Sequence, residues 1–315
     1  MRAFVLGNYM NAHFIHVDRL PVEGESLAAR RVFQEHGGKG LNLGVGLHRL
    51  GARVDMLMAV GSDEAGAGVR QALAREGLAL DRILTLGDSS GFGVGFIAPD
   101  GRNFLAAHLG ANALLTVDHV ESVRETLIAA DWLLAHFELP DPVVRHALAL
   151  ARAAGVSTYL NPSPWRPLDA ATLALVDVLV VNETEAAGLF GEDATDAWDR
   201  GDWCRLLPEL AARIDWRGRA LVVTLGPLGS VALGADGEVI QMAPPPIAQV
   251  DATGAGDAFG CGLVWSLSQG RPLAEALCFG NACGAHIAAR EGILAHLPRL
   301  EDLPGEPRSR RGENF

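Results

Sequence analysis

The chain has 315 residues, of which 49% are hydrophobic, enough for a large core, and it carries a formal net charge of −12. So acidic a surface excludes general binding to nucleic acid or to an anionic membrane, and we expect neither as a partner. No apolar stretch approaches the ~18 residues of a membrane-spanning helix, and the start "MRAFVLGNYM" does not read as a signal peptide. The four cysteines have neither metal-binding nor CxxC spacing. We therefore expect a cytoplasmic protein with reduced thiols.

Short apolar runs alternate with helix-like patterns along most of the chain. The expected strands are residues 3–7, 54–61, 132–137, 157–161, 176–182 and 220–226. The expected helices are residues 41–51, 64–77 and 142–155. Alternation of this kind is typical of βαβ units, and continuous apolar strands fit a sheet that helices cover on both faces. The sequence therefore predicts a three-layer α/β body with a mostly parallel central sheet.

Two segments interrupt this rhythm. Residues 8–36 and 91–108 each hold two alternating polar and apolar stretches around a turn. They predict antiparallel strand pairs that form a small β lid on one edge of the body. We expect residues 1–305 to form a single domain and the polar residues 306–315 to be a disordered tail.

Residues 34–44, "QEHGGKGLNLG", contain Lys39, the only lysine among the 26 basic residues of the chain. Two interpretations stay open. A composition that favours arginine can leave one lysine by drift. Alternatively, a compact ammonium on a flexible stem is needed where a planar guanidinium would not serve. In the second case the neighbouring glycines bring the backbone close to a ligand.

The second informative stretch is "VDATGAGDAFGCGLVWSL", residues 250–267. Gly254, Ala255 and Gly256 begin an expected helix of about a dozen residues, and free N–H groups at a helix N-terminus attract anions. Asp257 beside this cradle fits a base that takes a proton from a hydroxyl attacking a phosphate. If Asp257 only favoured the helix dipole, the glycine pattern would be unexplained.

Two common nucleotide motifs are missing. No G-x-x-x-x-G-K-[ST] loop exists, because Lys39 is followed by Gly40. The first strand leads into "GNYMN" rather than G-x-G-x-x-G, which disfavours a dinucleotide-binding oxidoreductase.

Two glycine-rich signatures and five stretches between them follow the order of a known family. The signatures are "GGKGLNLG" and "DATGAGDAF". The intermediate stretches are "HLGANALL" (108–115), "HFELP" (136–140), "LNPSPWRPL" (160–168), "VVNETEAAGLFG" (180–191) and "TLGPLGS" (224–230). On these residues, over about positions 3–300, the chain resembles the ribokinase/PfkB family of carbohydrate kinases, and most of all its ribokinase members.

The resemblance implies an ATP-dependent sugar kinase that uses Mg²⁺ and is activated by K⁺. It implies Asp257 as the catalytic base and Gly254, Ala255 and Gly256 as the anion hole for the transferred phosphoryl group. The implied sugar-contacting residues are Gly38, Lys39, Asn42 and Glu138. The implied nucleotide, phosphate and magnesium residues are Asn182, Glu185, Thr224, Gly226, Gly229 and Asn281. The implied monovalent-cation site comprises Asp251 with backbone at Thr253, Arg290 and Gly292. From the residues alone, Glu138 also fits a solvated loop, and Glu185 an ordinary first helical turn.

One departure from the family concerns the substrate. The family usually places an aspartate in the first lid strand to hold two sugar hydroxyls, and this chain has Ala12 or His13 there. We expect Asn11 and His13 to bind the substrate instead, and ribose not to be preferred. Kinases for another sugar, a sugar acid or a nucleoside are alternatives, as is a non-catalytic sugar-binding regulator on the same scaffold. The resemblance also implies a homodimer whose lids pack together.

Overall fold

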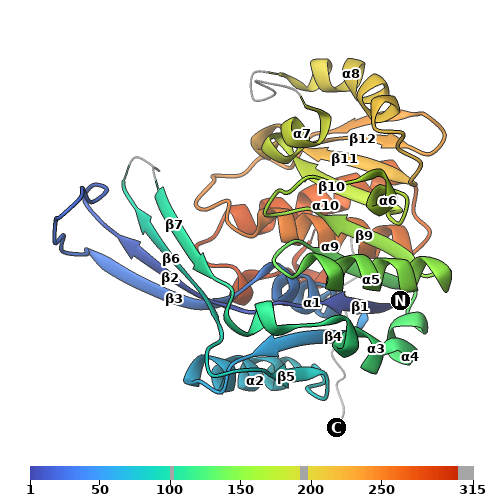
Figure 1. Cartoon of the computed structure of the whole chain (residues 1–315). Coiled ribbons are helices and arrows are strands. Elements are labelled where there is room, and N and C mark those ends of the chain that lie inside the picture. The colour runs from blue at the N-terminus through green and yellow to red at the C-terminus, as the bar shows by residue number, and fades with distance from the viewer. Residues whose placement is uncertain (100–102, 192–197, 304–315) are drawn as a thin grey trace, which may run out of the picture.

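A nine-stranded sheet forms the centre of the molecule in the computed structural model, which describes residues 1–99, 103–191 and 198–303 (Figure 1). Its strand order is β13-β12-β11-β10-β9-β8-β1-β4-β5, parallel from β11 to β5, with β12 and β13 antiparallel at one edge. The strands are β1 (Arg2–Leu6), β4 (Arg53–Val60), β5 (Ile83–Thr85), β8 (Trp132–His136), β9 (Ser157–Asn161), β10 (Val178–Asn182), β11 (Ala220–Thr224), β12 (Ser230–Gly234) and β13 (Val239–Met242).

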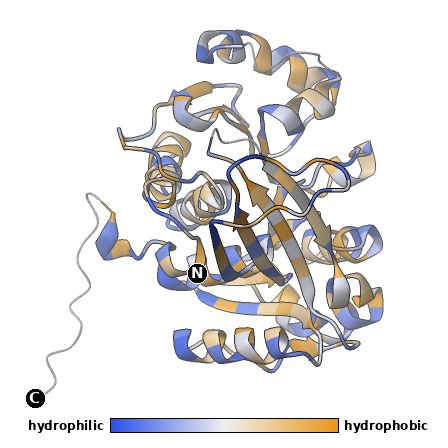
Figure 2. Ribbon diagram, turned by 90° about the vertical axis from the view of Figure 1, so that its left-hand side faces the viewer, coloured by the Kyte–Doolittle hydropathy of each residue, from blue (hydrophilic) through white to orange (hydrophobic). Residues whose placement is uncertain are grey.

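Helices cover both faces of this sheet, because successive side chains of a buried strand point to opposite sides. In β1, Ala3 and Val5 join one apolar cluster, and Phe4 and Leu6 join the other. The first cluster packs against α1 (Lys39–Arg49), α2 (Glu64–Glu76), α9 (Ala255–Ser268) and α10 (Leu273–Ala288). The second packs against α3 (Val117–Ser122), α4 (Arg124–Ile128), α5 (Asp141–Ala153), α6 (Ala170–Leu173), α7 (Glu183–Phe190) and α8 (Arg200–Arg213). The apolar strands of this core are visible in Figure 2. The predicted three-layer α/β body is confirmed.

A second, four-stranded sheet projects from one side of the body (left in Figure 1). Its order is β3-β2-β6-β7, from β2 (Met10–His16), β3 (Arg31–Gly37), β6 (Gly91–Ile97) and β7 (Asn103–His108). The pairs β2–β3 and β6–β7 are antiparallel, as predicted for the lid, and a parallel contact between β2 and β6 joins them. The predicted domain end at residue 305 and the tail 306–315 lie outside the described residues.

Short 3₁₀ helices complete the connections. They are η1 (Gly110–Leu114), η3 (Gly226–Leu228), η4 (Leu294–His296) and η5 (Leu300–Asp302). Across the three described ranges, no helix is both long and apolar enough to span a bilayer. The carboxyl ends of β1, β8, β10 and β11 meet at one edge of the parallel sheet, the edge where α/β proteins bind ligands.

Candidate active site

Helices α1 and α9 bring three predicted residues together at their N-terminal ends. Asp257 lies in the first turn of α9 and is buried. From α1, Asn42 Nδ2 donates a hydrogen bond to Asp257 Oδ2 at 2.7 Å, and Lys39 Nζ lies 3.6 Å from Asp257 Oδ1. Both carboxylate oxygens therefore face a donor. The single lysine of the chain is part of this cluster, which favours a chemical role over drift.

The glycines before Asp257 shape the start of α9. Gly254 has φ 77°, and a Cβ there would lie 2.5 Å from the side chain of Ile293. A Cβ at Gly256 would meet nothing within 4 Å, so this backbone is open to a ligand. The Ala255 N–H donates to Ala252 O at 3.1 Å, and its contribution to the anion hole stays a prediction. Among the described residues, the N–H groups of Gly254, Gly256 and Asp257 have no such partner.

The charge on Lys39 is held by three carboxylates. Burial lowers the pKa of Lys39, but Asp257, Glu138 and Glu185 together outweigh it, so the pKa stays above its ordinary value. An ammonium surrounded in this way keeps its positive charge at the point where α1 meets α9. Lys39 therefore offers a charged hydrogen-bond donor at this point.

Glu138 and Asn8 accept hydrogen bonds from the backbone of the glycine-rich loop at Lys39 and Gly40. Glu138 follows β8, and its Oε2 accepts hydrogen bonds from Asn8 Nδ2 (2.7 Å) and from the Lys39 N–H (3.0 Å). Asn8 follows the neighbouring strand β1, and its Oδ1 accepts from the Gly40 N–H at 2.8 Å. A Cβ at Gly40 would lie 2.4 Å from Asn8 N, so only glycine fits there.

His136, the last residue of β8, fixes the position of Glu138. The side chain is fully buried, and its Nε2 lies 2.9 Å from Leu6 O. Its Nδ1 accepts a hydrogen bond from the Glu138 N–H at 3.1 Å. Burial, reinforced by the nearby charge of Lys39, lowers the pKa of His136 to about 3. His136 is thus a neutral imidazole whose Nε2–H donates to the Leu6 carbonyl.

A cavity of about 840 Å³ extends from this cluster across the carboxyl ends of β10 and β11. At one end it is lined by Lys39, Gly254, Gly256 and Asp257. At the other it reaches the Pro-rich stretch 243–247. It also contacts most of the residues predicted to bind the nucleotide: Asn182, Thr224, Gly226, Gly229 and Asn281. Its size suits a nucleotide.

Two of these wall residues also have structural roles. Gly229 has φ 94°, and a Cβ there would lie 2.1 Å from Met242 O. Asn281 Nδ2 donates to Ser230 Oγ (3.1 Å) and to Met242 O (2.9 Å), which fastens α10 to β12 and β13.

Asn182 and Glu185 form the N-terminal cap of α7. Asn182 Oδ1 accepts from the Glu185 N–H at 2.8 Å, and Glu185 Oε2 accepts from the Asn182 N–H at 3.0 Å. Asn161 Nδ2 donates to the same Oε2 at 3.3 Å. Among the described residues, the hydrogen bonds to the Glu185 carboxylate use Oε2, which leaves Oε1 open to a ligand. The carboxylate is buried and close enough to act on Lys39.

Of the residues predicted for the monovalent cation, Asp251 and Thr253 are in direct contact. Asp251 Oδ1 accepts from the Thr253 N–H (2.9 Å) and hydroxyl (2.7 Å), and the Asp251 N–H donates to Ala288 O at 3.2 Å. Asp251 therefore lies beside the chain segment that follows α10 and contains Arg290 and Gly292. The side chain of Arg290 turns back to the carbonyl of His286, so any contribution of Arg290 to this site comes from its backbone.

Strand register decides which lid residues face the body. Ala12 pairs with Glu35 of β3, so these side chains share a face. Glu35 accepts a hydrogen bond from the Ile293 N–H at 3.0 Å, which turns that face towards the body. Asn11 and His13 lie on the other face of the same strand. By register, Met10, Ala12 and Phe14 share the face of Glu35, whereas substrate binding by Asn11 and His13 stays a prediction.

A family model described as "pfkB family carbohydrate kinase" matches residues 2–299. The chain belongs to this family. Ribokinase of Haemophilus influenzae is 30% identical over 300 residues, which cover 95% of each chain. A solved structure of Arabidopsis thaliana ribokinase complexed with ribose and ATP superposes with a TM-score of 0.81, at 26% identity over 95% of this chain and 96% of that one. Ribokinase of Cryptococcus neoformans in complex with ADP gives 0.80, at 26% identity over the same shares.

This pfkB-family protein is therefore a sugar kinase, an ATP-dependent phosphotransferase. Its geometry adds residues that the sequence patterns did not single out, namely Asn8, Glu35, His136 and Arg200, the last of which lines the nucleotide cavity. Asn8 and His136 lie at or just beyond the carboxyl ends of parallel strands. That position could have pointed to both of them.

The donor set around Glu185 fits the Mg²⁺ that such kinases use. Within the described ranges no cluster of three or more His, Cys, Asp or Glu side chains is placed as a metal cage. A divalent ion beside Glu185 Oε1 would thus take most of its ligands from nucleotide phosphates and water, the coordination that Mg²⁺ favours. When bound, the ion neutralises phosphate charge.

Proposed function

We propose that the kinase transfers the γ-phosphoryl group of ATP to a hydroxyl of a small sugar, with Asp257 as the general base. One observation carries the proposal. Asp257 lies at the open N-terminus of α9, between Lys39 and Asn42, and at the end of a cavity that suits ATP. A protein that only bound sugar would not need a buried carboxylate at this point, so the non-catalytic alternative is disfavoured.

Different residues would carry out the different steps of the reaction. Asp257 takes the proton of the attacking hydroxyl, and the resulting alkoxide attacks the phosphorus while the bond to ADP breaks. The free N–H groups of Gly254 and Gly256 and the Lys39 ammonium stabilise the charge on the phosphoryl oxygens. Asn42 Nδ2 orients the Asp257 carboxylate by donating to its Oδ2.

Ribose is the first substrate to test, because relatives named ribokinase match nearly the whole chain. The inner lid face argues for weaker ribose binding than in those relatives. Met10, Ala12 and Phe14 offer no charged acceptor there, and Glu35 is engaged by Ile293. A hydrogen bond to a charged group contributes about 1.5–3 kcal/mol. We therefore propose a raised KM for ribose relative to sugars with fewer hydroxyls at the lid.

Potassium dependence is proposed from Asp251. The Oδ1 atom of Asp251 accepts hydrogen bonds from Thr253, and the Asp251 N–H donates to the carbonyl of Ala288 at the end of α10. A carboxylate with backbone carbonyls suits a hard monovalent cation. Such a cation would stiffen the turn 251–254 that leads into the anion hole. Turnover in potassium chloride against sodium chloride at equal ionic strength tests this.

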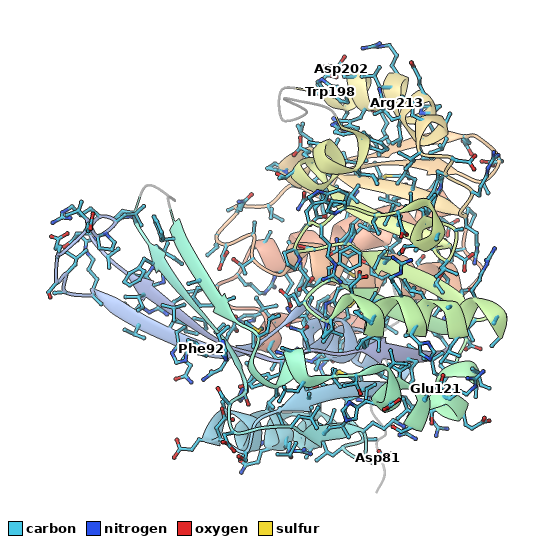
Figure 3. The ribbon with its side chains drawn as sticks, viewed as in Figure 1. Asp81, Phe92, Glu121, Trp198, Asp202 and Arg213 are labelled. Carbon is cyan, nitrogen blue, oxygen red and sulfur yellow. The ribbon has the colours of Figure 1, made fainter. Side chains whose placement is uncertain are left out.

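A homodimer through the lids is proposed from the outer lid face. Val32, Phe92 and Phe104 are 60%, 41% and 68% exposed and, by register, lie on the face that carries Asn11 and His13. Figure 3 labels Phe92 on this lid. An exposed apolar sheet face of this kind is commonly covered by a partner. We also propose a cytoplasmic location, where ATP is abundant.

The test of the catalytic proposal is a sugar panel with a coupled ADP assay. Wild-type enzyme should phosphorylate at least one pentose, and Asp257→Asn should abolish most of the turnover. Turnover without sugar that equals turnover with every sugar would contradict the proposal.

A further inference from the structure

A basic hollow of about 260 Å³ lies away from the nucleotide cavity, where the end of α1, the end of α10 and the segments η4 and η5 meet. Its wall is almost wholly polar. The charged and titratable residues that line it are Arg49, His286, Arg290, His296, Arg299 and Asp302. None of them lines the nucleotide cavity. In a chain with net charge −12, three arginines and two histidines around one hollow are unexpected.

The arginines differ in how far they are already engaged. Arg49 donates to Glu76 through Nε (3.1 Å) and Nη2 (2.6 Å), and through Nη1 to Leu297 O (2.9 Å). Arg49 therefore contributes positive charge to the hollow but few N–H donors for a ligand. Arg299 reaches Glu76 only at 3.4 Å. The recorded hydrogen bond of the Arg290 guanidinium, within the described residues, is the one from Nη1 to His286 O.

The local charge balance is positive even with both histidines neutral. Among the residues that the structure describes around the hollow, Asp302 lines it and Glu76 holds Arg49 and Arg299, against three guanidinium groups. Burial first, then Arg290 and His296, lower the pKa of His286, although Asp302 opposes this. At neutral pH His286 therefore offers a ring N–H donor rather than charge. An incoming anion meets N–H donors from several directions.

We propose that this hollow is a binding site for a phosphate-class oxyanion, either inorganic phosphate or the phosphoryl group of a small metabolite. Guanidinium groups bind such oxyanions through paired, charge-assisted hydrogen bonds. The volume holds a phosphoryl group with a few further atoms and is less than a third of that of the nucleotide cavity. Arg290 and Arg299, from segments on two sides of the hollow, supply the free donors.

The site connects to the catalytic region through the chain segment that carries Arg290 and His296. Between them, Ile293 packs beneath Gly254 and donates its N–H to Glu35 of the lid. An anion bound to Arg290 and His296 would therefore hold a segment that contacts both the start of α9 and the lid. Binding itself does not depend on catalysis, so its test is independent of the kinase assay.

The experiment measures anion binding at fixed pH and ionic strength, with the nucleotide cavity saturated by a non-hydrolysable ATP analogue and Mg²⁺. The assigned ring signals of His286 and His296 report on the hollow. Inorganic phosphate should shift both signals with a dissociation constant below about 10 mM and should raise the melting temperature by linkage. Chloride should do neither. Ribose 5-phosphate, tested separately, distinguishes a phosphorylated metabolite from free phosphate by the tighter constant.

Arg290→Gln and Arg299→Gln should each weaken phosphate binding by at least about 10-fold, equivalent to 1.4 kcal/mol. Arg205→Gln, which removes the same charge from an exposed position on α8, should leave the constant unchanged. If Arg290→Gln fails to fold, Arg299→Gln, at a half-buried position, still decides. Two results would overturn the proposal. One is the absence of any signal shift with both inorganic phosphate and ribose 5-phosphate. The other is equal phosphate binding by Arg299→Gln and Arg205→Gln.

Discussion

Replacing His136 by leucine should damage both folding and sugar binding. His136 is fully buried and joins two backbone groups, the Leu6 carbonyl (2.9 Å) and the Glu138 N–H (3.1 Å). Leucine leaves both groups buried and unpaired, at about 1–3 kcal/mol each. The free energy of unfolding should therefore fall by about 2–6 kcal/mol. At about 2–4 °C per kcal/mol the melting temperature should drop by at least about 4 °C.

The same change should act on the sugar through Glu138. With its N–H released, Glu138 loses the contact that fixes its backbone, while its carboxylate still holds Asn8 and the Lys39 N–H. We expect the sugar KM to rise by about 10-fold, a cost of about 1.4 kcal/mol, with a smaller effect on the KM for ATP. His136→Gln is the matched control, because its amide has one donor and one acceptor for the same two groups.

Urea unfolding and steady-state kinetics on the three proteins provide the check. The glutamine variant should recover most of the stability and of the sugar KM. If leucine and glutamine variants lose stability and KM equally, the hydrogen-bonding role of His136 is refuted. A leucine variant as stable as wild type would refute the argument about unpaired groups.

Four further predictions follow from other parts of the molecule. Lys39→Met should lower kcat at least about 10²-fold. Because the Lys39 pKa is raised, its charge should be fully present at neutral pH and be lost only as pH rises past the ordinary lysine value. A near-normal kcat for Lys39→Met at neutral pH would contradict the assignment. Ala12→Asp should lower the ribose KM by about 10-fold or more, whereas His13→Asp should not; the reverse result would show the register argument to be wrong. Phe104→Asp should turn a dimer seen by light scattering into a monomer, and a wild-type monomer at micromolar concentration would contradict the lid interface. Replacing potassium by sodium should slow turnover in wild type but have little further effect in Asp251→Ala, and equal wild-type rates would remove the cation site.

The central fold could be predicted because its strands are continuous apolar runs with helix patterns between them. Residues 157–161 were predicted with the bounds that β9 has. The strands β5, β12 and β13 were not anticipated. β5 and β13 are short and lie at the two edges of the sheet, where only one neighbour pairs with each, and a few residues carry little periodic signal. β12 pairs on both sides, and it follows β11 after a short turn. The helix α1 begins at Lys39 rather than residue 41, since glycines give no propensity signal for a helix start.

The site could be predicted in its composition but not in its orientation. Asp257, Lys39 and Asn42 come from two signatures, and the fold brings them into contact. For Asn11 and His13 the sequence could not settle orientation, because a shift of one residue moves a strand side chain to the other face and the sequence of a half-exposed strand does not fix its register. Nor could it show that a turn engages the N–H of Ala255. His136 contributes through two backbone groups, which no residue pattern reveals.

The most direct measurement of the central claim is the single-turnover rate of Asp257→Asn with nucleotide affinity measured beside it. Asp118→Asn, an exposed acid in the first turn of α3, is the control for an acidic residue at a helix start. The account predicts a rate at least about 10²-fold below wild type, with ATP affinity changed by less than about 3-fold, and a wild-type rate for Asp118→Asn. A near-normal rate for Asp257→Asn with bound ATP and sugar would contradict the assignment of Asp257 as the base.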